Sequence, residues 1–270
     1  LKNVANRNNF DAVYAQAQRA ADPAEKESLL LSCIEILPSS YEAYQSLIDT
    51  YKGDTTFTTE EEAQLKKCLF PNLSQLQAGE GYGELAFELG KLYWYYYDYG
   101  DAADNAVTRM TSSTRWFEDA LDYGSPEASY RSMAAVYRDI GLFNQNITLD
   151  VEEASDMGKY APYWENLKEL ARQMEENPDQ AEIVTLECYR LVTDAVETYA
   201  RKFKADGVSQ EEMEQVLASI RNGTENLQPT TDKTEALKAY IMGRFDSAGE
   251  SIANAFVETR VPDSEQVVER

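Results

Sequence analysis

The sequence predicts an all-α protein, and three observations support this class. Of its 270 residues only 13 are Gly and 8 are Pro, and they stand at spaced points along the chain. The long stretches between them repeat apolar residues every three or four positions, which is the period of a helix with one buried face. No stretch shows the sustained alternation of apolar and polar residues that a half-buried strand requires.

Turn and cap residues divide the N-terminal part into successive helices. Apolar spacing predicts helices over Phe10–Tyr14 and Tyr44–Tyr51, and Pro38 marks a helix end between them. Thr58 and Glu61 have the spacing of a capping box, in which each side chain accepts an N–H group that a helix start leaves unpaired. We therefore expect a further helix to begin directly after Thr58.

The middle of the chain continues this pattern. Helices are predicted over Ala86–Tyr93 and Tyr130–Tyr137, and the helix between them is expected to end at Gly124. Gly141 marks the next expected helix end. Asp150 then repeats the capping-box spacing, with a Glu three residues later, and predicts another helix start.

Longer amphipathic patterns follow in the C-terminal part. After a turn at Gly158 and a first-turn Pro162, one pattern runs over residues 179–205. The next helix begins after the cap residue Ser209, and the last carries apolar residues from Leu237 to Phe256. The apolar stripes are wide, so these helices are expected to pack on one another or on the preceding helices.

These patterns predict three regions. Residues 1–176 form an array of helix pairs, and residues 177–261 form a bundle of long helices that caps the open end of the array. Residues 262–270 form a polar tail.

Charge and composition exclude several classes of function. The chain has 25 Lys and Arg against 48 Asp and Glu, a net charge of −23, which disfavours nucleic acid and anionic membrane surfaces as partners. It has no apolar stretch long enough for membrane insertion. The absence of His excludes His-based triads, His-ligated zinc and His acid–base catalysis. No cofactor motif is present, so neither a cofactor nor a metal is expected.

The three cysteines, Cys33, Cys68 and Cys188, are far apart and match no metal or redox spacing. Each has apolar neighbours at helical spacing, so we interpret them as small buried hydrophobic residues. The chain begins at Leu1 without a Met, which is typical of an excised or processed piece and leaves room for an address or anchor upstream.

A self-comparison shows a repeat in the first helix of each predicted pair. A residue that is usually aromatic is followed three positions later by an apolar one. In the helices that begin the repeat at Ala86 and Tyr130 a small residue comes next, and in these two and the Tyr44 helix a Tyr stands seven positions after the first member. Gly90 would let the two helices of its pair approach, while Tyr51, Tyr93 and Tyr137 would fill the space against neighbouring pairs. The first members lie 34, 42, 44 and 34 residues apart. They are Phe10, Tyr44, Ala86, Tyr130 and Trp164.

This repeat resembles the tetratricopeptide/Sel1-like superfamily of helical repeats. The stretch most similar to its Sel1-like branch is Trp116-Phe117-x-x-Ala120-x-x-x-Gly124-x-x-x-Ala128, followed by Tyr130. The resemblance covers residues 1–176, and it departs at Ala86, which lacks the ring, and at Lys168, which replaces a small residue. It implies an α-solenoid of TPR/Sel1-like helix pairs, capped by the C-terminal bundle, whose concave groove binds a protein or peptide.

A second resemblance concerns the aromatic segment Leu89–Gly100, with Arg115-Trp116-Phe117 and Tyr199–Lys204. It is similar to the repeat region that follows the kinase domain and membrane helix of Gram-positive serine/threonine protein kinases. The chain has no kinase catalytic motifs, so the resemblance implies a non-catalytic sensor or scaffold part. It also implies the extracytoplasmic face of a bacterial membrane, and without it the cytoplasm is expected.

The aromatic and basic residues of the first helices predict a ligand site. Five consecutive rings from Tyr93 to Tyr97 point in all directions around a helix, so some are expected on the groove wall or against an insertion. In a chain of charge −23, cations beside these rings would bind carboxylate-bearing peptide or cell-wall material. The alternative is that the cations merely pair with nearby acids. The predicted site residues are Phe87, Lys91, Trp94, Tyr95, Arg131 and Arg138.

Two other functions stay open at this point. One is an extracytoplasmic sensor that binds a small cell-wall fragment through its Tyr and Trp surface. The other is an all-helical hydrolase that uses paired carboxylates such as Glu175 and Glu176. Asp98, Asp101 and Asp104 surround Gly100 but lack the ligand spacing of a calcium loop.

Overall fold

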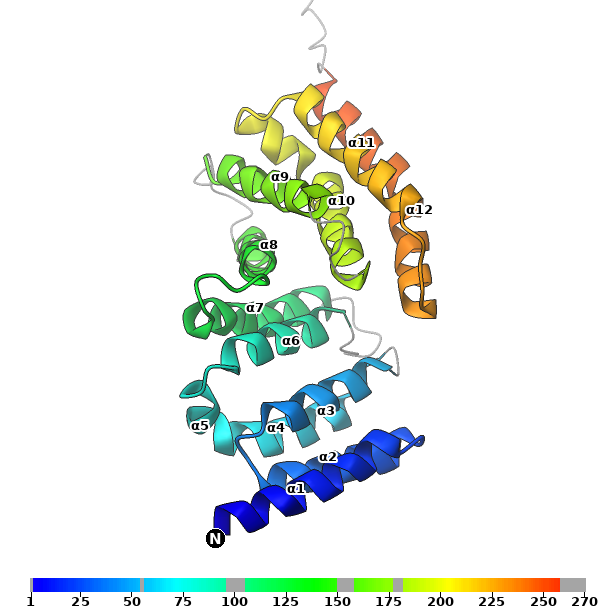
Figure 1. Ribbon diagram of the computed structural model, residues 1–270. Coiled ribbons are helices and arrows are strands. Elements are labelled where there is room, and N and C mark those ends of the chain that lie inside the picture. Colours follow the sequence, from blue (N-terminus) through cyan, green and yellow to red (C-terminus); the bar gives the residue numbers. More distant parts are fainter. Residues whose placement is uncertain (1, 54–55, 96–104, 150–157, 177–181, 258–270) are drawn as a thin grey trace, which may run out of the picture. The chain divides into compact units, whose positions relative to one another are not determined.

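The computed structural model describes residues 2–53, 56–95, 105–149, 158–176 and 182–257 (Figure 1). Every regular element in these ranges is a helix, which confirms the predicted all-α class. No described helix is long and apolar enough to cross a membrane. The chain divides into two compact units, unit 1 (Leu1–Glu152) and unit 2 (Glu153–Arg270).

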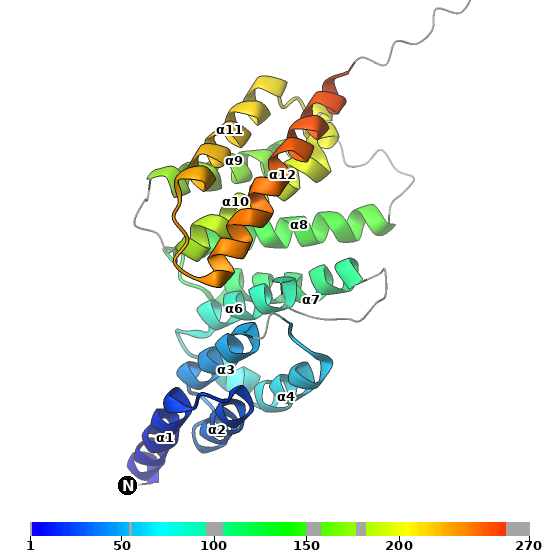
Figure 2. The same ribbon diagram turned by 90° about the vertical axis from the view of Figure 1, so that its right-hand side faces the viewer.

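Unit 1 is built of helices that pack largely in chain order. Helix α2 packs on α1 and α3, α3 packs on α6, and α7 packs on α6 and α8. Figures 1 and 2 show α1 beside α2 and α6 beside α7. The helices are α1 (Lys2–Arg19), α2 (Pro23–Ile36), α3 (Tyr41–Gly53), α4 (Thr59–Leu69), the 3₁₀ turn η1 (Phe70–Asn72), α5 (Leu73–Gln77), α6 (Tyr82–Tyr95), α7 (Asn105–Tyr123) and α8 (Arg131–Leu149).

Local signals fix most of the helix ends in unit 1. The predicted capping box is present at the start of α4, where Thr58 and Glu61 satisfy each other's backbone N–H groups. The predicted end at Gly124 is confirmed, because α7 ends one residue earlier. The predicted end at Gly141 is wrong: this residue is buried within α8. A single Gly costs a helix only about 1 kcal/mol, which packing on α7 can offset.

Helices α6 and α7 approach each other unusually closely. A Cβ atom on Gly90 would lie 2.5 Å from the Phe117 ring, and one on Gly83 would lie 2.5 Å from the Cα atom of Gly124. Only hydrogen fits at such distances, so the glycines permit this packing. The predicted role of Gly90 in the close approach of a helix pair is therefore confirmed.

The repeated tyrosines also contact neighbouring helices as predicted. Tyr51 of α3 stacks on Phe57 with ring centroids 5.4 Å apart, and Phe57 meets Tyr93 of α6 edge-on at the same distance. Tyr137 of α8 stacks on Phe117 of α7 at 4.7 Å. Aromatic side chains thus form much of the contact between successive helices of unit 1.

Unit 2 consists of α9 (Tyr160–Glu176), α10 (Glu182–Ala205), α11 (Gln210–Asn226) and α12 (Asp232–Phe256). Helix α12 packs along α10 and also contacts α11, and α10 in turn contacts α9 and α11 (Figure 2). The three long C-terminal helices that the sequence predicts are therefore present. The tail at 262–270, the cap at Asp150 and the acidic loop around Gly100 lie outside the described residues.

The boundary between the units differs from the sequence expectation. We expected the helix that contains Trp164 to close the first region at residue 176, but it belongs to unit 2. The reason is that the rings of α9 pack on α10, with the centroid of Trp164 5.3 Å and that of Tyr163 5.8 Å from the centroid of Phe203. Apolar burial, rather than repeat register, decides where this helix packs.

A long-range cap holds the start of α9. The carboxylate of Asp206 accepts hydrogen bonds from the N–H groups of Gly158 at 2.9 Å, Tyr160 at 2.6 Å and Ala161 at 3.2 Å. Gly158 and Gly207 both have positive φ, +91° and +94°, which confirms the predicted turns at these positions. The end of α10 thus satisfies the N–H groups that the start of α9 leaves unpaired.

Candidate functional site

The two predicted site rings on α6 are buried. Phe87 is 5% exposed and stacks on Tyr130 with centroids 5.2 Å apart, and Trp94 is 6% exposed with its centroid 5.0 Å from Tyr137. Both rings also contact Phe117 of α7. This corrects the expectation that they line an open wall, because α7 and α8 cover that face of α6. The side chain of Tyr95 lies outside the described residues.

Lys91 belongs to an ion-pair cluster that is centred on the half-buried Glu88. Its Nζ lies 2.9 Å from Oε1 of Glu88 and 4.8 Å from the ring centroid of Phe87. Lys52 of α3 donates to the other oxygen of Glu88 at 2.5 Å. The cluster therefore joins α3 to α6 and leaves Lys91, 8% exposed, little surface to offer a ligand.

Replacing Glu88 by Gln is expected to destabilise unit 1 at pH 7 and to remove part of its acid sensitivity. Burial alone would raise the pKa of the Glu88 carboxyl, but Lys91 and Lys52 outweigh burial and hold that pKa below its usual value. A depressed folded-state pKa gives stability that is present above the unfolded pKa and is lost as the pH falls through the folded pKa. We expect Glu88→Gln to lower the free energy of unfolding of unit 1 by about 1–3 kcal/mol at pH 7.

Urea denaturation at neutral and at acidic pH measures this effect. The difference in the free energy of unfolding between the wild type and Glu88→Gln should shrink below about pH 4, because the wild-type carboxyl also becomes neutral there. A difference of equal size under both conditions would contradict the assigned ion pairs.

The two predicted arginines of α8 have partners within the fold. Arg131 donates from Nη1 to the carbonyl oxygens of Leu121 at 2.6 Å and Gly124 at 3.2 Å, and so caps the C-terminal end of α7. Arg138 pairs with Asp139, with Nη2 and Oδ1 2.8 Å apart. The alternative in which the cations pair with nearby groups therefore describes Lys91, Arg131 and Arg138 better than a shared anion site does.

The first helices of the predicted pairs, α1, α3 and α6, instead share a polar face that is formed by side chains in contact with one another. Arg7 of α1 pairs with Glu42 of α3 at 2.8 Å, and Tyr14 of α1 bonds to Ser46 of α3 at 2.8 Å. The Lys52–Glu88 pair continues this line to α6. The polar face comprises Arg7, Asp11, Tyr14, Gln18, Glu42, Gln45, Ser46, Asp49, Lys52 and Glu88, and the buried Lys91 joins it only through Glu88.

Sequence reasoning found part of this face and missed the rest. The spacing along the predicted helix Tyr44–Tyr51 places Gln45 and Asp49 on the groove side, and in the structure Gln45 donates to an exposed Asp49 at 3.3 Å. The residues of α1 were missed, although Arg7, Asp11 and Tyr14 recur at helical spacing and signal one side of a helix.

The described residues offer little for metal or thiol chemistry. Within them no group of three His, Cys, Asp or Glu side chains could hold a metal ion, and Asp98, Asp101 and Asp104 lie outside them. Cys33 and Cys188 are buried as predicted, and Cys68 is half-buried. Burial raises the pKa of the Cys33 and Cys68 thiols to about 11, which disfavours the reactive thiolate.

The chain matches no protein-family model, no curated protein and no solved structure.

Proposed function

We propose that this chain is a non-catalytic interaction module, in which TPR/Sel1-like helix pairs form a solenoid in unit 1 and the polar face binds a basic segment of a partner protein. The single observation that carries the proposal is the line of side-chain contacts across α1, α3 and α6. This line of contacts supports a stack in which the first helices of successive pairs contact one another, as in repeat proteins that bind along such a face.

The charge of the face favours a basic partner. Arg7 already pairs with Asp11 and Glu42, so it is not available to recruit an acidic segment. Asp49 of the polar face remains exposed, with no cation paired to it among the described residues. In a chain of charge −23, such a face attracts Lys- and Arg-rich segments and raises their association rate.

Reversing two charges of the polar face is expected to weaken a basic peptide's binding by about tenfold. The variant Glu42→Lys with Asp49→Lys changes exposed side chains of α3. A matched control, Glu35→Lys with Glu118→Lys, makes the same change in net charge on α2 and α7, at exposed positions that are not part of the face.

The measurement is fluorescence anisotropy with short peptides of equal length that are basic, neutral or acidic. The proposal expects the basic set to bind best, binding to weaken as salt is added, and only the α3 variant to lose affinity. Equal loss in both variants would mean that net charge alone attracts the peptide. Preference for the acidic set would overturn the proposal.

A further inference from the structure

A cleft of about 590 Å³ opens within unit 2, where the C-terminal ends of α9 and α11 meet the N-terminal end of α10. This volume is in the range of sites that hold a small molecule. The cleft is lined by carboxylates, amides and hydroxyls, and no Lys or Arg is among its lining residues. Its chemistry therefore differs from that of the polar face, and the inference does not depend on the function proposed above.

Tyr189 of α10 provides a hydroxyl at the base of the cleft. The side chain is 4% exposed, and its hydroxyl makes no hydrogen bond to another described residue. A Cβ atom on Gly223 of α11 would lie 2.6 Å from this hydroxyl, so the glycine makes room for it. Burial, with the nearby charge of Glu175, raises the pKa of Tyr189 and keeps the hydroxyl protonated.

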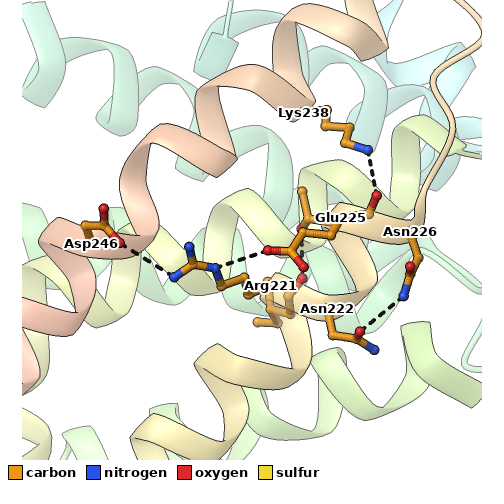
Figure 3. Close-up of polar contacts among 8 residues, drawn as sticks. Arg221, Asn222, Glu225, Asn226, Lys238 and Asp246 are labelled. Atoms are coloured by element: carbon orange, nitrogen blue, oxygen red, sulfur yellow. Dashed lines mark hydrogen bonds and ion pairs between the residues drawn. The ribbon is translucent and has the colours of Figure 1, made fainter.

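The α11 side of the cleft presents amide groups whose neighbours hold them in place. Asn226 donates to Oδ1 of Asn222 at 3.1 Å, which leaves an amide donor on Asn222 and an amide acceptor on Asn226 (Figure 3). Lys238 of α12 donates to the carbonyl oxygens of Glu225 at 2.9 Å and Leu227 at 2.6 Å. This ties the end of α11 to α12.

Arg221 of α11 does not line the cleft and has its partners elsewhere. Arg221 pairs with Glu225 at 3.2 Å and with Asp246 of α12 at 3.5 Å (Figure 3). In the cleft, Glu182 accepts from the backbone N–H of Thr230 at 2.8 Å. Glu175 has no ion-pair partner among the described residues. The cleft therefore combines an uncompensated carboxylate with neutral hydrogen-bonding groups.

We propose that this cleft binds a small molecule that carries an ammonium group together with hydroxyl or further amine groups, such as an amino sugar or a polyamine. The ammonium pairs with Glu175, because a charge-assisted hydrogen bond there gives the largest gain. Tyr189, Asn222 and Asn226 bind the remaining polar groups of the ligand. Their donors and acceptors select a polar molecule over an apolar one.

Calorimetric titration of the full chain with glucosamine, spermidine and glucose tests this site. Binding of either amine and not of glucose supports the proposal, and the amine that binds identifies the source of the ammonium group. Glu175→Gln and Tyr189→Phe should each weaken binding about tenfold. The matched control is Glu176→Gln, which makes the same charge change at the next residue, in a side chain that pairs with Arg172.

Circular dichroism of each variant separates loss of the site from loss of the fold. Glu175 is exposed, so Glu175→Gln should melt like the wild type. The proposal would be overturned by glucose binding as tightly as glucosamine, by no binding of either amine, or by undiminished affinity in Glu175→Gln.

Discussion

Replacing Gly90 by Leu is expected to lower the free energy of unfolding of unit 1 by about 3 kcal/mol. The first atom of the new side chain would already lie 2.5 Å from the Phe117 ring. That ring cannot retreat freely, because it stacks on Tyr137 with centroids 4.7 Å apart and also contacts Trp94. The helices α6 and α7 must therefore separate, and the packing between α7 and α8 is strained with them.

Gly243→Leu is the matched control for this substitution. Gly243 is an exposed glycine of α12 with no atom within 4 Å of the Cβ position, so Leu there meets no obstacle. Better helix propensity should then stabilise α12 by up to about 1 kcal/mol. Urea denaturation followed by circular dichroism measures the free energy of unfolding of Gly90→Leu and of Gly243→Leu. Wild-type stability of Gly90→Leu would show that α6 and α7 are not packed as described.

Replacing Phe203 by Ala is expected to lower the free energy of unfolding of unit 2 by about 3–5 kcal/mol. Phe203 is fully buried, and its ring packs among those of Tyr160, Tyr163, Trp164 and Tyr199. Truncation removes the Phe203 ring contacts between α9 and α10 and leaves a cavity lined by large rings. The Asp206 cap also holds the backbone of Tyr160 in place, so this end of α9 cannot move freely into the space.

Hydrogen exchange read by mass spectrometry shows which helices this substitution loosens. Peptides from α9 and α10 should exchange faster in Phe203→Ala than in the wild type. Phe70→Ala serves as the control, since Phe70 is 50% exposed and its loss should change stability by less than about 0.5 kcal/mol. Unchanged protection of α9 would mean that Phe203 does not hold this helix.

Much of the helical content could be predicted from the sequence because helices are local structures. The spacing of apolar residues indicates each helix, and Thr58 and Gly207 mark ends through bonds that span only a few residues. The requirement for a small residue at Gly90 was also readable, since the repeat aligns this position with Ala134. These inferences need no knowledge of which distant segments meet.

The candidate sites depended on contacts that no local pattern contains. Periodicity placed Phe87 and Trp94 on one side of α6, but whether solvent or another helix covers that side is decided by α7 and α8. The polar face and the cleft of unit 2 arise in the same way, from side chains far apart in sequence.

The sequence by itself therefore determined the helical class, several helix boundaries, the need for a small residue at position 90 and the acidic character of the chain. Only the tertiary structure decided that α9 joins the C-terminal helices, that the aromatic residues of α6 are core, and that Asp206 caps a helix 46 residues earlier in the chain. The physical reason is that hydrogen-bond geometry and side-chain sterics act between near neighbours in sequence, whereas apolar burial is non-directional and pairs whichever faces the whole fold brings together.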